Sequence, residues 1–440
     1  MRNRTGPPRS KELKIKRVWS TTGVVALTGA LLLNSAPTAS ADYVRDQQWV
    51  LDVFSMKKTW AETQGEGVTV AVVDTGVDGD HPDMTGQVLT GKDYTSGGNA
   101  REDIAGHGTR VASLVAGHGH GSGNASGMVG LAPKAKILPL RTMQTKHDKN
   151  PEELWAEAVR YAADRGAKVI NLSFANEYGQ TGPLGQKAIA YAQSKDVVVV
   201  AGTGNNGGDV GYPAALPGVV AVGAVDKNAN IWSSSNTGKQ VALTAPGVRI
   251  LAADPTRSPE YSVADGTSDA TAYVSATAAL VRAKYPDLTA GQVINRLIKS
   301  ASFLGHKGLK APNEEYGYGI IRPYQAVTMD IPKGPEANPL GRIQLADEVT
   351  AGDDSAASQS ENEKGSSSMG FIALAVGVIG LGVVVAAVTV FAVTRSRRTS
   401  GNGGPVSGMP PQNMGYPPQQ PMYPTAQQPY PTAAPNQGYP

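Results

Sequence analysis

The sequence predicts an α/β domain built on a mostly parallel β-sheet, and three observations support this fold class. Short apolar runs typical of buried strands alternate along residues 42–330 with amphipathic segments of helical period. Strands that alternate with helices are joined by crossovers, which cover both faces of a parallel sheet. The chain has 440 residues and no cysteine, so it is long enough for a large core but cannot be a disulfide-stapled scaffold.

Charge and cysteine content exclude several classes of function. There are 40 basic and 37 acidic residues, but the net positive charge lies at the two ends of the chain, and the middle carries a net negative charge. An acidic middle lacks the basic patch that nucleic-acid binding requires, so no nucleic-acid partner is expected. The absence of cysteine excludes a thiol nucleophile and any metal site with thiolate ligands.

The N-terminal residues 1–41 predict a secretory signal peptide. A basic stretch is followed by an apolar run over 18–33 and by the small residues Ala39 and Ala41, the pattern of a cleavage site. An uncleaved membrane anchor is the alternative, although the apolar run is short for a span. We therefore expect export of the chain and cleavage after Ala41.

Residues 369–393 predict one C-terminal transmembrane helix. These 25 residues carry no charge, and as a helix they would extend about 37 Å, enough to cross the hydrocarbon core. A buried core helix is the alternative, but such helices rarely lack every polar group over this length. The arginines that follow, Arg395, Arg397 and Arg398, predict a cytoplasmic C-terminus. The expected location is the cell membrane, with the folded domain outside the cytoplasm.

Two segments around this helix predict no packed core. Residues 331–368 are rich in Pro, Gly, Ser and acidic side chains, which indicates a flexible linker. Residues 394–440 repeat Tyr-Pro four times among Gln and Pro, which favours a disordered cytoplasmic tail. A docking peptide is the alternative for this tail.

The domain 42–330 is expected to carry its functional residues at one edge of the sheet, because sites in such sheets form at the carboxyl ends of the strands. Helices are predicted from Asn150 as N-cap to residue 166, and after a capping box at Thr289 and Gln292. Apolar runs predict buried strands at 68–73, 135–140, 169–173, 197–201 and 219–223.

The segment 42–67 precedes the first predicted strand. It is too short to fold as a separate prodomain, since domains below about 40 residues are marginal even when stapled. We expect this N-terminal extension to pack on the domain and to remain in the mature protein. Its apolar and aromatic side chains are Trp49, Val50, Leu51, Val53, Phe54 and Trp60.

Four residues supply candidate chemistry at the expected edge of the sheet. They are Asp74 at the end of the first strand, His107 between glycines at a helix start, Asn205 in a glycine-rich turn and Ser268 at a helix N-terminus. Each alone has a structural explanation, such as a helix cap or a packed histidine, and His81 is expected only to shape a turn. Together they provide the nucleophile, base, orienting carboxylate and oxyanion donor of acyl transfer.

The segments around these residues resemble the subtilisin family of serine proteases. Segments 72–83, 106–112 and 266–275 are similar to the three motifs of the family, and the order Asp, His, Ser is that of subtilisin. The resemblance covers about 45–330 and implies a subtilisin-like three-layer fold with a mostly parallel central sheet.

The resemblance also implies a role for each candidate. Ser268 would attack the peptide carbonyl, His107 would accept the proton and Asp74 would orient His107. Asn205 and the backbone N–H of Ser268 would bind the oxyanion. No metal or other cofactor is expected. An extended peptide would pair with the substrate-binding residues Ser173, Phe174, Ala175, Gly202, Thr203 and Gly204.

Three features together resemble the mycosins, the membrane-anchored subtilisins of type VII secretion systems. They are the signal peptide, the lead-in Gln47-Gln48-Trp49 and the single C-terminal span. The implied partners are a peptide or protein substrate, the membrane and a type VII secretion membrane complex. Two positions depart from the family pattern, since Ala272 replaces a usual proline and Ala175 replaces a common glycine.

Two alternatives belong to other classes. An aspartic protease would need a second Asp-Thr-Gly besides that at Asp74, and the sequence has none. A non-catalytic component that braces a secretion complex would keep the fold but commonly lose a catalytic residue. All four candidate residues are present, so an active endopeptidase is favoured.

Overall fold

A computed structural model describes residues 1, 39–95, 97–145, 148, 150–176 and 179–345. These residues belong to a compact unit that spans 1–357. The predicted helix 369–393, the predicted tail and most of the predicted signal peptide lie outside the described residues. Within the described part of the chain, no helix is both long and apolar enough to cross a membrane.

A seven-stranded sheet forms the centre of the domain, in the order β2-β5-β1-β6-β7-β8-β9. Every neighbouring pair in it is parallel, which confirms the predicted sheet type. The five predicted strands are present with shifts of one or two residues at their ends, and β2 and β9 were not predicted. The strands are β1 Thr69–Asp74, β2 Lys92–Asp93, β5 Lys136–Arg141, β6 Val169–Leu172, β7 Val198–Gly202, β8 Val220–Val225 and β9 Val241–Pro246.

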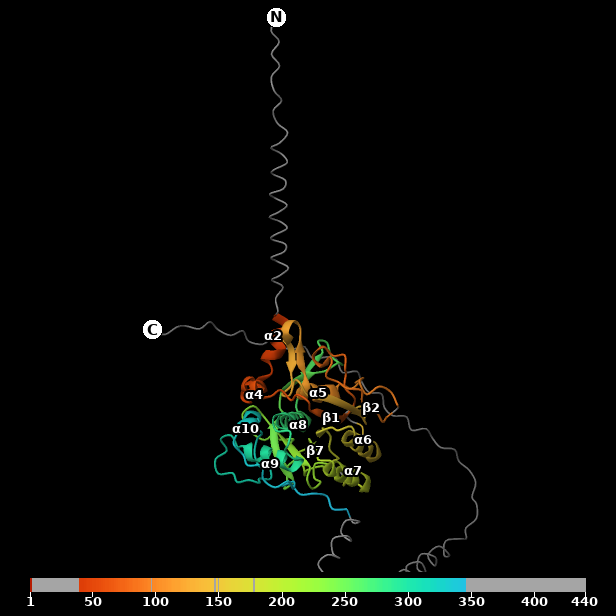
Figure 1. Ribbon diagram of the computed structural model, residues 1–440, viewed down its shortest axis with the longest axis vertical. Coiled ribbons are helices and arrows are strands. Elements are labelled where there is room, and N and C mark those ends of the chain that lie inside the picture. The colour runs from red at the N-terminus through yellow and green to blue at the C-terminus, as the bar shows by residue number, and fades with distance from the viewer. Residues whose placement is uncertain (2–38, 96, 146–147, 149, 177–178, 346–440) are drawn as a thin grey trace, which may run out of the picture. The chain divides into compact units, whose positions relative to one another are not determined.

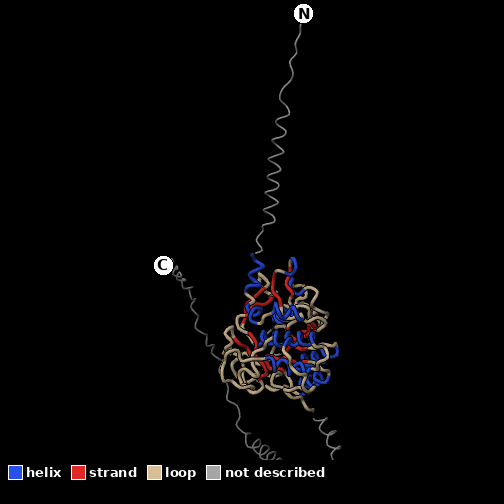
Figure 2. The backbone as a smooth tube through the Cα atoms, turned by 60° about the vertical axis from the view of Figure 1, so that its left-hand side comes forward, coloured by secondary structure: helices blue, strands red, loops and turns tan. Residues whose placement is uncertain are grey.

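Helices cover both faces of the sheet and produce three layers (Figures 1 and 2). Alternate residues of β1 point to opposite faces, so Val70 and Val72 join one core cluster while Ala71 and Val73 join the other. The first cluster includes α5 His107–Ala116, α8 Thr267–Lys284, α9 Ala290–Ser300 and α10 Pro323–Thr328. The second includes α6 Glu152–Asp164 and α7 Pro183–Ser194.

Two small hairpins flank the sheet and carry polar contacts used below. One pairs β3 His118–His120 with β4 Ser126–Val129, and the other pairs β10 Ile250–Ala253 with β11 Tyr261–Ala264. His81 caps the short 3-10 helix η1 Pro82–Met84 by accepting from the Asp83 N–H at 3.1 Å, as expected for a turn-shaping residue.

Of the two predicted helix starts, the structure confirms one and contradicts the other. The capping box at Thr289 and Gln292 is confirmed, with reciprocal bonds of 3.3 and 3.1 Å. The prediction that Asn150 caps α6 is wrong, because Pro151 occupies the cap position. Asn150 adopts a left-handed φ of 39° instead of the extended conformation that a cap residue needs.

The N-terminal extension packs on the domain through three short helices, and the first of them begins within the predicted signal peptide. They are α2 Ala39–Asp46, α3 Trp49–Val53 and α4 Met56–Glu62. The side-chain amide of Gln48 bonds both the N–H and the C=O of Val129, each at 2.9 Å, and so extends the edge of β4. Phe54 and Met56 are buried in the first core cluster, with Phe54 edge-on to Tyr273 at 6.1 Å between ring centroids. In Figure 1, α4 lies beside α10, in agreement with their contacts.

This packing leads to a prediction about maturation. Phe54→Ala should lower the free energy of unfolding by about 3–5 kcal/mol, because it removes a buried aromatic ring. Val53→Ala is the matched control, since Val53 is 54% exposed and should cost little. Urea unfolding measures both variants, and mass spectrometry locates the mature N-terminus. A chain that starts near Gly65 and gains activity only after that cut would contradict a permanent extension.

Residues 331–345 differ from the expected linker, because they lie against the domain. Leu340 accepts a bond from the Gly218 N–H at 2.9 Å, and the Asn338 amide donates to the Gly218 carbonyl at 2.8 Å. Ile343 is buried in the second core cluster. The packed unit therefore continues to at least residue 345, and the rest of the predicted linker lies outside the described residues.

Candidate active site

The predicted site residues gather at the carboxyl edge of the parallel sheet. Asp74 is the last residue of β1, Ser173 follows β6, and Asn205 follows β7. The N-termini of α5 and α8 bring His107 and Ser268 to this edge. Both helices begin after a glycine in the cap position, Gly106 and Gly266. The topology thus supplies each side chain from a different element.

Asp74 and His107 form a short, shielded hydrogen bond. The imidazole Nδ1 lies 2.7 Å from Oδ1 of Asp74, whose side chain is fully buried, while the His107 side chain is 16% exposed. Burial lowers the pKa of His107, but the charge and hydrogen bond of Asp74 and the charges of Asp269 and Asp103 outweigh it, so the pKa is raised. A carboxylate at Nδ1 fixes the tautomer in which Nε2 can accept a proton.

Asp103, which sequence reasoning missed, holds the loop that leads into α5. Its carboxylate accepts from the N–H groups of Gly106 and Thr109 and from the Thr109 hydroxyl, each at 2.8 Å. It also accepts from the hydroxyl of Thr75, the residue after Asp74, at 2.9 Å. The network fixes the start of the His107 helix against the end of β1. A carboxylate four residues before His107 was the available signal.

Ser268 is the second residue of α8 and is hydrogen-bonded to Ser173, which follows β6. Its hydroxyl donates to the carbonyl oxygen of Ser173 at 3.1 Å, and the Ser173 hydroxyl donates to the carbonyl oxygen of Ser268 at the same distance. In this structure the hydroxyl of the nucleophile candidate therefore bonds Ser173, a predicted substrate-binding residue, and not His107. Catalytic hydrogen bonds often form or tighten only when substrate is bound, so a rotation about χ1 would be required.

Asn205 is tied to the same helix start. Its side-chain Oδ1 accepts from both the N–H and the hydroxyl of Thr267, each at 2.9 Å. Because Oδ1 takes both bonds, Nδ2 is the atom that would donate to an oxyanion. The glycine-rich turn before Asn205 is also held by Thr267, whose hydroxyl lies 3.4 Å from the Gly204 nitrogen.

The predicted substrate-binding residues form the wall around these groups. Phe174 and Ala175 are partly exposed, and Phe174 packs on Trp155 with ring centroids 6.0 Å apart. Asn176 pairs with Tyr212 through reciprocal backbone bonds of 2.7 and 3.1 Å, which close the wall. The other predicted members are buried, and these are Ser173, Gly202, Thr203 and Gly204.

A model of the Subtilase family matches residues 65–319, which is more than half of the chain and includes every site residue above. The chain belongs to the subtilase family. It is accordingly a subtilisin-like serine protease, with peptides or proteins as substrates. The subtilase fold explains the seven-stranded sheet and the layers of helices.

Known subtilases show the extent of the similarity. The thermophilic serine proteinase of Bacillus sp. (strain AK1) is 35% identical over 300 residues, covering 68% of this chain and 71% of that protein. Thermitase of Thermoactinomyces vulgaris is 36% identical over 248 residues, covering 56% and 85%.

Solved mycosin structures resemble this fold. MycP1 from Mycobacterium smegmatis has a TM-score of 0.58 at 30% identity and covers 68% of this chain and 88% of that one. MycP3 protease from the type VII (ESX-3) secretion system has a TM-score of 0.55 at 31% identity and covers 64% and 88%.

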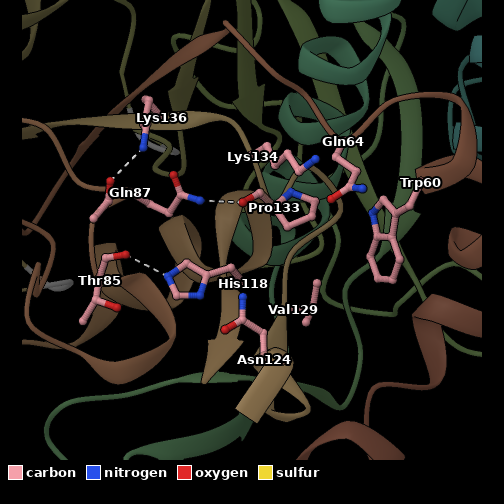
Figure 3. Close-up of a pocket in the computed structure, with 12 residues that line it drawn as sticks. Trp60, Gln64, Thr85, Gln87, His118, Asn124, Val129, Pro133, Lys134 and Lys136 are labelled. Carbon is pink, nitrogen blue, oxygen red and sulfur yellow. Dashed lines mark hydrogen bonds between the residues drawn. The ribbon is translucent and has the colours of Figure 1, made fainter. Parts of the chain in front are cut away.

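A pocket of about 470 Å³ lies elsewhere, between the N-terminal extension and the β3–β4 hairpin (Figure 3). Trp60 forms one wall, and the Nε2–H of His118 donates to the Thr85 carbonyl oxygen at 2.8 Å. None of the predicted site residues lines it. Among the described residues, no group of three or more His, Cys, Asp or Glu side chains is arranged to hold a metal ion.

Proposed function

We propose that this subtilase cleaves peptide bonds with Ser268 as nucleophile, His107 as general base and then acid, and Asp74 as the orienting carboxylate. The 2.7 Å bond between Asp74 and His107 Nδ1 is the observation that carries this assignment. The imidazole takes the Ser268 proton as the hydroxyl attacks the carbonyl carbon, and later delivers it to the leaving amine. Asp74 orients the imidazole and stabilises the imidazolium that forms.

The oxyanion would be held by the Asn205 Nδ2 group and the backbone N–H of Ser268. Ser268 lies in the first turn of α8, where N–H groups have no partner within the helix and the helix dipole favours negative charge. Thr267 orients the amide of Asn205 before substrate arrives. Donors fixed in advance cost little reorganisation as charge develops in the transition state.

Substrate would bind as an extended strand along residues 173–175 and the turn 202–204. A peptide that pairs with the backbone presents its scissile carbonyl between Ser268 and Asn205, while alternate side chains meet the wall at Phe174 and Ala175. The test is labelling of the purified protein with a fluorophosphonate, with and without a competing peptide substrate. If the competing peptide does not suppress labelling, this binding mode is contradicted.

We further propose that the enzyme is a membrane-anchored, extracytoplasmic protease of the mycosin type, with a partner in type VII secretion. The apolar residues 369–393, the arginines after them and the likeness to MycP1 and MycP3 support this proposal. With this topology, catalysis would take place outside the cytoplasm, at the membrane surface.

Membrane topology yields a direct prediction. Protease added to intact cells should cut within 346–368 and release a soluble domain, because residues 331–345 are packed on that domain. The tail 394–440 should stay protected on the cytoplasmic side. Immunoblots with tags at both ends of the mature chain measure this. Digestion of the tail in intact cells would contradict the orientation.

A further inference from the structure

A buried ion pair joins the two helices that carry His107 and Ser268. Arg110 Nε and Nη2 donate to the two oxygens of Asp269, each at 2.8 Å, in a bidentate arrangement. The side chains are only 7% and 2% exposed. Arg110 lies one turn after His107 on α5, and Asp269 directly follows Ser268 on α8.

The guanidinium is fully engaged by its surroundings. Nη2 also donates to the Ile250 carbonyl oxygen, and Nη1 donates to the carbonyl and hydroxyl oxygens of Ser262 at 3.1 and 3.2 Å. Arg110 therefore connects α5 to α8 and to both strands of the β10–β11 hairpin. Burial lowers the pKa of Arg110, but the charge and hydrogen bonds of Asp269 outweigh it, so the pKa is raised and the cation is retained.

Stability alone does not account for such a pair. Two buried charges lose their hydration, and apolar side chains of similar volume are often equally or more stabilising. What a bidentate arginine–carboxylate pair adds is geometry, because two parallel hydrogen bonds fix both distance and angle. Apolar contacts at the same place would allow the helices to slide.

We propose that Arg110 and Asp269 are positioning residues that set the register of α5 against α8, and thereby the distance between His107 and Ser268. This inference rests on the proposed roles of those two residues. Neither Arg110 nor Asp269 takes part in bond making. Their effect should appear in kcat, because misplacement of a base by about 1 Å can cost up to roughly 100-fold in rate.

The test uses the full-length protein in detergent and the double variant Arg110→Met/Asp269→Leu, which removes both buried charges together. We expect a melting temperature close to that of the parent and a kcat lower by about 10- to 100-fold, with KM within about twofold. A double variant of parental stability and a kcat within about twofold of the parent would overturn the proposal.

A matched control lies on the other end of α8. Arg282 is also buried and bonds Asp196 at 3.0 Å and the Leu288 carbonyl, far along the helix from Ser268. Arg282→Met should lower the melting temperature and leave the kcat of the folded enzyme unchanged. A loss of kcat in Arg282→Met as large as in the double variant would show a general effect of buried arginines and reject a special role for Arg110.

The pH profile separates geometry from charge. The charges of Asp74, Asp269 and Asp103 raise the pKa of His107, and Arg110 pairs with Asp269. Asp269→Leu alone should shift the acid limb of kcat/KM to lower pH, because it removes a charge that raises the His107 pKa, and Arg110→Met alone should shift it to higher pH. The double variant removes both charges of the pair, so its midpoint should move less than in either single variant, while its plateau is lowered. If the double variant shows a strongly shifted midpoint but keeps the parental plateau of kcat/KM, the positioning role of the pair is overturned.

Two further variants keep the test decisive. If the double variant does not fold, Arg110→Lys keeps the charge but loses the bidentate contact, so kcat should still fall at constant KM. A folded Arg110→Lys enzyme with parental kcat would overturn the inference. Ser268→Ala is measured in parallel, because activity in that variant would reject the proposed function itself and not the positioning pair alone.

Discussion

Ser268→Ala should abolish peptide cleavage and fluorophosphonate labelling while the domain stays folded. Loss of a triad serine typically lowers kcat by about 10⁶-fold, since no other group can form the acyl-enzyme. The folded state loses one hydrogen bond, from the Ser268 hydroxyl to the Ser173 carbonyl, which costs about 1 kcal/mol. Hydrolysis of a chromogenic peptide and the melting temperature measure both effects.

Ser275→Ala is the matched control for this variant. Ser275 is a buried serine of the same helix whose hydroxyl donates to the Asn171 side chain at 2.8 Å. It should lose some stability and keep full labelling. Parental cleavage by a folded Ser268→Ala protein would reject Ser268 as the nucleophile.

Asn205→Ala should lower kcat by about 10²–10³-fold with little change in KM, because the Nδ2 donor acts mainly on the charge that develops in the transition state. The substitution also removes the acceptor that holds Thr267. Asn205→Asp separates the two roles, since it keeps an oxygen for Thr267 but offers no donor and adds a repulsive charge. We expect it to be at least as inactive as Asn205→Ala.

The neighbouring Asn206 controls for local damage to the turn. Its Oδ1 accepts from the Gly208 N–H at 2.9 Å, so Asn206→Ala perturbs the same loop without removing the proposed donor. Steady-state kinetics on the three variants decide between the positions. A larger loss of kcat in Asn206→Ala than in Asn205→Ala would place the oxyanion donor one residue away.

The candidate site was predictable from the sequence because its residues lie at the ends of apolar runs or next to glycines at helix starts. Asp74 ends an apolar run, and His107 and Ser268 follow glycines at helix starts, so local pattern and sheet topology together place them at one edge. The parallel sheet was predictable for the same reason, since continuous apolar runs alternate with helices. These features depend on neighbours in sequence.

What sequence reasoning missed depends on contacts between distant segments. Arg110 and Asp269 are 159 residues apart, and neither type of side chain is expected in a core without its partner. Residues 331–345 contain three prolines and two glycines, which is typical of a linker, yet Leu340 and Ile343 pack on the domain. No helix or strand pattern in this segment predicts those contacts. Asn150 shows the reverse case. Its local sequence predicts a helix cap, but the backbone takes a left-handed conformation there and the helix begins later.

The location of the covalent adduct shows whether Ser268 is the nucleophile of this subtilase. The purified full-length protein is treated with a fluorophosphonate, digested and analysed by tandem mass spectrometry. We expect a single adduct on Ser268, formed at a rate that rises with pH as His107 loses its proton. An adduct on another serine, or none in a preparation that cleaves peptides, would contradict it.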